Sequence, residues 1–224
     1  MKQVIQALRQ YCKLGCCKLG SVSRLFIPMG LGLVITLSLS WLGHHAVNAF
    51  EANQYATGSS TWQGASFPVE NFQGYTSPFG YRTSPTGGGT QFHRGLDMAA
   101  PEGSYIRSWW TGKVVEVSDD SACGTSVVIE SGEWEHIYCH MQGHVERDSQ
   151  GRPYMIDRGG GLQIYEGQDI SAGTRIGRVG MTGRTTGPHL HWGLKYAKQW
   201  VDPALVLRAM YAEQSRTQTI SSQL

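Results

Sequence analysis

Histidine and aspartate residues occur in three short segments whose spacing brings several of them to one face, because side chains alternate between the faces of an extended chain. His93 and Asp97 therefore share a face, as do His189 and His191. A third segment places four residues on one face: Trp134, His136, Tyr138 and His140. Three strands can thus aim ligands into one groove. Two imidazoles and one carboxylate, with a fourth position open to water, form the ligand set of a catalytic zinc site.

Simpler roles are expected for the other histidines. A lone surface histidine is usually only solvated, and we expect that state for His44, His45, His136 and His144. His189 and His191 have an alternative role as hydrogen-bonding residues of a core. Pro188 and the glycine-rich turn before it favour the edge of a strand instead, so this pair stays a candidate for chemistry.

The segments that must position these residues have the pattern of short strands separated by glycine. Runs rich in β-branched and aromatic residues cover 113–117, 126–130, 134–141 and 174–179, and the chain contains 29 glycines. We therefore predict an all-β fold, an antiparallel β-sheet or open barrel-like sandwich with a groove. Residues 147–161 combine charge with Pro153 and three consecutive glycines, which predicts a long surface loop beside the groove.

The ends of the chain differ from this central part. Asp202 and Pro203 form a good helix start, so we predict a short C-terminal helix over 204–212. The ordered domain is expected over 72–207, and a frayed tail over 208–224. Residues 50–71 are polar and irregular and predict a linker or short prosegment. We keep open the hypothesis that this segment lies across the groove and inhibits it.

Residues 1–49 have the pattern of an export signal. Five of the 19 basic residues precede an uncharged run over 25–43, and Val47-Asn48-Ala49 then offers a cleavage site after Ala49. The alternative is an uncleaved membrane anchor, because the run is close to the length that spans a bilayer. Both interpretations place the rest of the chain outside the cytoplasm. That remainder has 14 basic and 17 acidic residues, a net charge of −3, which gives no electrostatic reason to expect nucleic-acid binding.

Two cysteines belong to the exported part. Cys123 and Cys139 flank Ser131-Gly132-Glu133, so a hairpin centred there would bring their strands side by side. An oxidising compartment permits a disulfide, but sequence does not fix the geometry that a disulfide needs. The pairing is therefore one of two open alternatives, the other being two free thiols.

Four segments in a fixed order carry more information than any one of them. SPFGYR (77–82), FHRGLDMAAP (92–101), YCHM (138–141) and TGRTTGPHLHW (182–192) are similar in order and spacing to the lysostaphin/LytM-type metallopeptidase family. The similarity runs from about Ser77 to Leu207. It departs from the family at Cys139 and Met141, where Tyr-Ala-His-Leu is frequent, and at Ser84, where many members carry histidine before proline.

The resemblance implies roles for five residues. The family's metal ligands fall on His93, Asp97 and His191, and its two catalytic histidines on His140 and His189. It implies one Zn²⁺ per chain and a zinc-dependent endopeptidase over 72–207 that hydrolyses peptide bonds in bacterial peptidoglycan. Because no glutamate is placed as a base, histidine must relay the proton of the attacking water.

Two other functions compete with this prediction. Some relatives with this fold lack the zinc ligands and regulate other cell-wall hydrolases, whereas all five positions are filled here. A non-enzymatic β-barrel carrier or glycan-binding module is suggested by the glycine turns at 166–168 and 172–177. We expect a monomer in the periplasm or cell wall whose partner is a peptidoglycan peptide, with membrane association only if the N-terminal segment is uncleaved.

Overall fold

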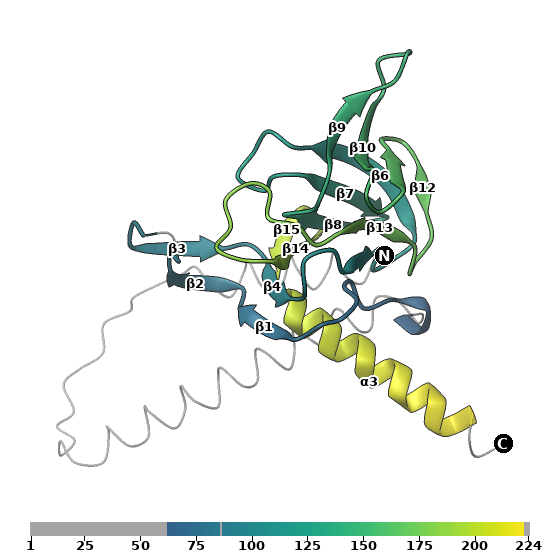
Figure 1. Ribbon diagram of the computed structural model, residues 1–224. Coiled ribbons are helices and arrows are strands. Elements are labelled where there is room, and N and C mark those ends of the chain that lie inside the picture. The colour runs from purple at the N-terminus through teal and green to yellow at the C-terminus, as the bar shows by residue number, and fades with distance from the viewer. Residues whose placement is uncertain (1–61, 86, 222–224) are drawn as a thin grey trace, which may run out of the picture. The chain divides into compact units, whose positions relative to one another are not determined.

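The computed structural model describes residues 62–85 and 87–221 (Figure 1). The predicted export signal, with His44 and His45, and residues 50–61 lie outside the described residues. No helix in the described part of the chain is both long and apolar enough to span a bilayer.

An antiparallel sheet of eight strands forms the centre of the fold (Figure 1). Its strands follow the order β1-β4-β14-β8-β7-β6-β12, and β15 also pairs with β14. In the same order their bounds are Gly74–Ser77, Leu96–Ala99, His189–Tyr196, Trp134–Cys139, Ser126–Ser131, Gly112–Ser118 and Asp169–Ile170, with β15 at Gln199–Val201. β7 and β8 form the predicted hairpin around Gly132, whose φ of 63° suits the turn.

Three smaller antiparallel sheets complete the all-β architecture, which confirms the predicted class. One pairs β2 with β3, the second pairs β5 with β13, and the third contains β9, β10 and β11. In chain order their bounds are Gly80–Thr83, Thr90–His93, Tyr105–Arg107, His144–Arg147, Pro153–Asp157, Leu162–Tyr165 and Arg175–Arg178 for β13.

The core lies against one face of the main sheet. Along β14, Leu190, Trp192 and Leu194 are fully buried, whereas His189, His191 and Lys195 on the other face are partly exposed. Trp109 packs edge-on against Trp192 with ring centroids 5.8 Å apart. The opposite face of β14 is therefore left for His189 and the other polar residues of the groove.

The segment 147–161 is not the long loop that its composition predicts. Arg147 ends β9 and residues 153–157 form β10, and this hairpin stands out from the main sheet (Figure 1). Met155 is fully buried, and Arg178 in β13 donates two hydrogen bonds to the Asp157 carboxylate, at 2.6 and 2.7 Å. One buried side chain and one bidentate ion pair thus order a segment whose residues are mostly polar.

The ordered structure also starts earlier and ends later than predicted. A 3₁₀ turn, η1 (Trp62–Gly64), precedes Phe72, and the C-terminal helix α3 runs over Pro203–Ser221. Trp62 is 3% exposed, and Gln214 of α3 donates to its carbonyl oxygen at 2.9 Å. The two segments therefore order each other across 152 residues of sequence. Residues 62–71 do not line the groove, so the inhibitory hypothesis applies only to residues 50–61.

Candidate metal centre and active site

Neighbouring strands of the main sheet bring the predicted residues into one row. β14 lies between β4 and β8, and its His191 is the register partner of Asp97 in β4 and of Cys139 in β8. His189 lies on the same face of β14 as His191. His93 is the last residue of β3, three residues before β4 begins. The chain turns between these strands at Arg94 and Gly95, which brings His93 close to Asp97 and His191.

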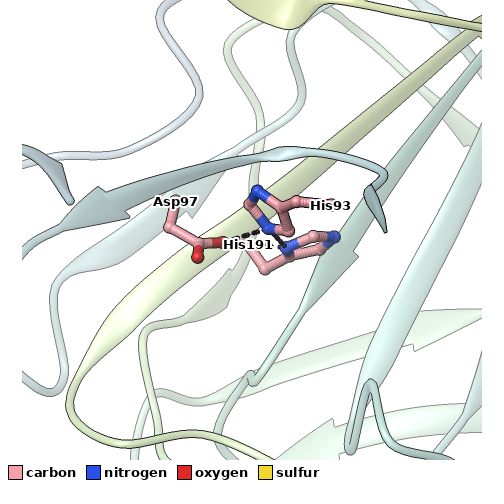
Figure 2. A group of neighbouring side chains, drawn as sticks. All are labelled: His93, Asp97 and His191. Atoms are coloured by element: carbon pink, nitrogen blue, oxygen red, sulfur yellow. Dashed lines mark hydrogen bonds and ion pairs between the residues drawn. The ribbon is translucent and has the colours of Figure 1, made fainter. Parts of the chain in front are cut away.

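The side chains of His93, Asp97 and His191 point toward one another (Figure 2). His93 Nε2 lies 2.9 Å from His191 Nδ1 and 3.0 Å from Asp97 Oδ1, and His191 Nδ1 lies 2.8 Å from the same oxygen. Donors around one tetrahedral zinc ion, with bonds of about 2.0–2.1 Å, lie roughly 3.3 Å apart. The three atoms thus approximate one face of a metal coordination shell. Within the described residues, this is the one His, Cys, Asp or Glu group with that arrangement.

Hydrogen bonding determines which nitrogen of His93 carries the proton and which one turns a lone pair toward Asp97 and His191. Its Nδ1 lies 2.7 Å from the Pro78 carbonyl oxygen. That oxygen only accepts, so Nδ1 carries the proton and donates. In the neutral ring Nε2 then turns a lone pair toward the Asp97 carboxylate, which also only accepts. His93 Nε2 and Asp97 Oδ1 lie 3.0 Å apart, and their lone pairs repel each other unless a cation lies against both atoms. The donor set therefore fits a divalent metal ion.

Asp97 is held in its charged form. Burial alone raises the pKa of its carboxyl, but the imidazoles of His191 and His93 against it outweigh burial and hold the pKa well below the usual range. Arg82 donates to the other carboxylate oxygen, Oδ2, at 3.3 Å, and also to the hydroxyl of Ser77. The contact of Arg82 with Oδ2 turns the other oxygen, Oδ1, toward the histidines, and outer partners of metal ligands generally orient those ligands in this way.

Gly95 is required for space at this point. A Cβ atom at this position would lie 2.6 Å from Cε1 and 2.7 Å from Nε2 of His191, and 2.8 Å from the carbonyl oxygen of Trp192. The carbonyl belongs to the backbone of β14 and cannot move aside freely. The absence of a side chain at Gly95 therefore lets His191 reach the cluster.

The two predicted catalytic histidines lie side by side, with ring centroids 4.8 Å apart. His140 Nδ1 donates to the Thr182 carbonyl at 2.9 Å, and His189 Nδ1 donates to the Gly187 carbonyl at 2.8 Å. Each ring therefore keeps the Nε2 lone pair for the hollow that both residues line. Burial lowers the pKa of His140 to about 4, so its ring is neutral at pH 7. Two imidazoles that each turn an Nε2 lone pair to the groove can accept and pass on protons.

His140 reaches the groove by a different route from the one predicted. β8 ends at Cys139, and His140 has a positive φ of 60°. This backbone turn places His140 with Ile137 and Cys139 in the lining of the groove, on the opposite face from Tyr138.

His136 is not the solvated surface residue that the sequence predicts. It is fully buried, with Nε2 2.8 Å from Ser131 Oγ and Nδ1 2.8 Å from the Tyr138 hydroxyl. The Tyr138 oxygen accepts from the backbone N–H of Trp109 at 2.7 Å, so its own proton points to His136 Nδ1. Nε2 then carries a proton and donates to Ser131. His136 cannot activate that hydroxyl, and its role is structural. His144 is exposed, as predicted.

Two adjoining hollows form a groove across the cluster. One has a volume of ≈ 220 Å³ and the other ≈ 340 Å³. They share five lining residues: Arg82, Pro85, His140, Arg184 and His191. Three arginines, Arg82, Arg94 and Arg184, line the groove against one acidic residue, Asp97. Residues 147–161 do not line it, so the prediction that this segment lies beside the groove is wrong.

Cys123 and Cys139 form a disulfide. Cys139 immediately precedes His140, and both cysteines line the larger hollow. The structure thus selects the disulfide from the two alternatives that the sequence left open.

Sequence reasoning missed the residues that orient the site. Arg82 falls inside a motif segment, so its charge beside Asp97 was a usable signal. The carbonyl groups of Pro78, Thr182 and Gly187 carry no such signal, because every residue has one and only the fold decides which histidine it meets.

Known proteins share these segments. Mpg of Neisseria meningitidis, a DD-carboxypeptidase/endopeptidase, is 30% identical over 132 residues, which are 58% of this chain and 26% of Mpg. ShyA of Vibrio cholerae, a peptidoglycan DD-endopeptidase, is 33% identical over 102 residues, 46% of this chain and 20% of ShyA. The chain thus spans about a quarter or less of the length of these relatives.

A solved structure resembles the chain as well. A zinc-containing peptidase from Vibrio cholerae superposes with a TM-score of 0.47 and 29% identity, over 64% of this chain and 38% of that one.

The model of peptidase family M23 matches residues 91–152 and 155–203. These ranges contain all five predicted site residues. The chain therefore belongs to peptidase family M23 and has a metal-dependent peptidase domain.

Proposed function

We propose that this protein is a zinc metalloendopeptidase that hydrolyses peptide bonds in bacterial peptidoglycan, with one Zn²⁺ held by His93, Asp97 and His191. The family membership and the printed activities of Mpg and ShyA support this proposal. One observation carries it. The donor atoms of His93, Asp97 and His191 turn lone pairs toward one another and need a cation between them. They lie beside two histidines whose Nε2 atoms line the same groove.

The residues of the site divide the chemistry between them. When bound, zinc supplies Lewis acidity, which makes water a nucleophile near neutral pH and polarises a peptide carbonyl. His140 and His189 are held by backbone carbonyls with their Nε2 atoms free to accept, so they take up the proton of the attacking water and return it to the leaving nitrogen. Once protonated, they present an Nε2–H group that also stabilises the charge that develops on the carbonyl oxygen.

The groove suggests what kind of peptide is bound. It is open, and three arginines line it. The guanidinium of Arg184 makes no side-chain hydrogen bond or ion pair within the described residues, and it belongs to both hollows. A thin peptide with a free carboxylate fits these features, because a guanidinium binds carboxylates through two parallel hydrogen bonds. Peptides of the bacterial cell wall belong to this class.

Neither competing function is favoured. A regulator without catalysis has no need of three metal ligands flanked by two proton-accepting histidines, and all five residues lie together here. A carrier or glycan-binding module rests on the glycine turns at 166–168 and 172–177, which connect strands of the sheet.

A location outside the cytoplasm, which we also propose, agrees with this function. A disulfide between Cys123 and Cys139 is typical of oxidising compartments, and the peptide substrate is found outside the cytoplasm. We place the domain in the periplasm or cell wall, and its monomeric state stays a prediction.

Metal analysis and hydrolysis of purified peptidoglycan together test this function. We expect about one zinc ion per chain, hydrolysis by the wild-type protein, loss of hydrolysis on treatment with a chelator and recovery when zinc is added back. A protein that binds no zinc, or that holds zinc and cuts no peptide bond in peptidoglycan, would contradict the proposal.

Five variants separate ligands from catalysts. His93→Ala, Asp97→Ala and His191→Ala should lose zinc and activity together. His140→Ala and His189→Ala should keep zinc and lose roughly 100-fold or more in kcat, the usual scale for an acid–base group.

The exposed His144 supplies the matched control, and His144→Ala should change neither quantity. Zinc retained in His93→Ala or His191→Ala, or lost from both His140→Ala and His189→Ala, would overturn the division of roles.

A further inference from the structure

The disulfide lies next to a residue that the proposed function makes catalytic. Cys139 ends β8 and His140 follows it, while Cys123 belongs to the cysteine loop (residues 119–125), which joins β6 to β7. We propose that the Cys123–Cys139 disulfide is a positioning device for His140, which hydrolysis needs and metal binding does not. This inference rests on the proposed function.

The backbone of His140 is fixed by the cysteine loop. Its N–H donates to the Cys123 carbonyl at 2.8 Å, and the next N–H, that of Met141, donates to the Thr125 carbonyl at 2.9 Å. These bonds hold His140 at a φ of 60°, which costs energy for any residue other than glycine. His140 therefore keeps this conformation only while its surroundings enforce it.

The imidazole of His140 is fixed through the same loop by a second route. Its Nδ1 donates to the carbonyl of Thr182, in a segment (residues 182–184) that packs directly on the cysteine loop. The Arg184 N–H donates to the Ala122 carbonyl at 2.9 Å, and the Thr125 N–H donates to the Thr182 hydroxyl at 2.9 Å.

The two segments approach too closely for side chains at their contact. A Cβ atom on Gly124 would lie 2.3 Å from the carbonyl carbon of Thr182, and one on Gly183 would lie 2.4 Å from the nitrogen of Gly124. A closed ring of contacts thus joins His140, the 182–184 segment and the cysteine loop. The disulfide is the covalent link in this ring.

The metal ligands meet this ring only through the backbone of Cys139, the register partner of His191 in β8, and a serine at position 139 keeps that backbone pairing. His93 is held by the Pro78 carbonyl and Asp97 by Arg82, and His191 lies within β14 between two paired strands. Loss of the disulfide should therefore leave zinc in place. Movement of His140 by about 1 Å is enough to cost a large factor in rate, so the effect should fall on kcat.

The test removes the disulfide with Cys123→Ser/Cys139→Ser, a double change that leaves no single thiol beside the metal. We expect zinc to stay near one per chain, kcat on a peptidoglycan peptide to fall 10-fold or more, and KM to change less than 3-fold. Met210→Ala serves as control, because it removes a core side chain of α3 far along the chain from the groove. It should lower the melting temperature and leave kcat unchanged.

A double-mutant cycle distinguishes positioning from general destabilisation. When His140→Ala is already present, removing the disulfide should lower kcat less than 2-fold further. An unchanged kcat in the double-cysteine variant, or an equal fall with and without His140, would overturn the inference. Loss of zinc in that variant would overturn it too.

If the double-cysteine variant does not fold, Thr182→Val tests the ring of contacts through which the disulfide acts on His140. It removes the hydroxyl that joins the 182–184 segment to Thr125 and leaves the disulfide intact. The same fall in kcat is expected, again only while His140 is present. A wild-type protein without hydrolysis would overturn the proposed function and this inference together, and that result precedes every variant.

Discussion

The buried His136 should make the fold sensitive to acid. It is fully buried between Ser131 and Tyr138, and the ring of Trp109 packs edge-on against it at 5.6 Å. Burial lowers the pKa of His136 to about 3, because a charged imidazole has no water and no carboxylate near it to stabilise its charge. In the unfolded chain the same side chain has a pKa of about 6.5.

The sign and size of the effect follow from linkage. A histidine whose pKa is lowered by folding contributes its full stability above the unfolded pKa, and that stability is lost as the pH falls from about 6.5 toward 3, since only the unfolded chain takes up the proton. Each unit of the difference corresponds to about 1.4 kcal/mol. His136 alone should therefore cost about 2 kcal/mol at pH 5, about 4 kcal/mol at pH 3 and about 5 kcal/mol well below pH 3.

Urea unfolding at pH 7.5, 6 and 5 measures this contribution. Between pH 7.5 and 5 the wild-type free energy of unfolding should fall by about 2 kcal/mol more than that of His136→Gln, which has no titrating ring. The other histidines and the metal ligands contribute equally to both proteins and cancel in the comparison. Parallel pH curves for the two proteins would refute the claim that His136 is neutral and buried.

Three further changes test other parts of the structure. Gly95→Ala should push His191 away from the cluster and lower zinc occupancy in metal analysis, whereas Gly74→Ala, with nothing within 4 Å, should not. Arg184→Gln should raise KM by roughly 10-fold or more for a peptide with a free carboxylate and leave KM for its amide unchanged, which steady-state kinetics will show. Trp62→Ala should cost about 3–5 kcal/mol in urea unfolding without changing kcat, because the buried ring lies outside the groove.

Alternation along a strand predicted the central pair well. β14 is paired on both sides and has no bulge, so its period of two holds from His189 to Tyr196. His189 and His191 consequently face the groove while Leu190 and Trp192 face the core. Sequence reasoning succeeds here because regular pairing leaves the backbone no freedom to change the face of a side chain.

The same rule failed in β8, and the cause is one backbone angle. Alternation groups His136, Tyr138 and His140 on one face, and it holds for the first two, which are both buried in the core. At His140 the positive φ reverses the direction of the side chain. His140 therefore lines the predicted groove, but it lies on the opposite face from His136 and Tyr138, with which alternation had grouped it. Sequence gives no sign of this, since histidine rarely takes such an angle without tertiary contacts.

Long-range contacts explain the remaining errors. Composition predicts an unordered start at Trp62 because the local sequence is irregular and polar. That residue is ordered by α3, whose Gln214 and Glu213 bond to its backbone. In the same way Asp157 orders the hairpin through Arg178, 21 residues later. A local pattern cannot reveal a segment whose stability depends on partners so distant in the chain.

Main-chain acceptors decide the chemistry of the site more than the histidines do. His93, His140 and His189 each donate from Nδ1 to a backbone carbonyl, those of Pro78, Thr182 and Gly187 respectively. A ring held in this way exposes its Nε2 lone pair, the form that binds a metal or accepts a proton. His191 instead meets the cluster through Nδ1, and the gap at Gly95 accommodates the rest of its ring. The motif supplies imidazoles, but the loops that present those carbonyls determine which ring nitrogen faces the substrate, and a change in the loops alone can therefore abolish activity with every histidine in place.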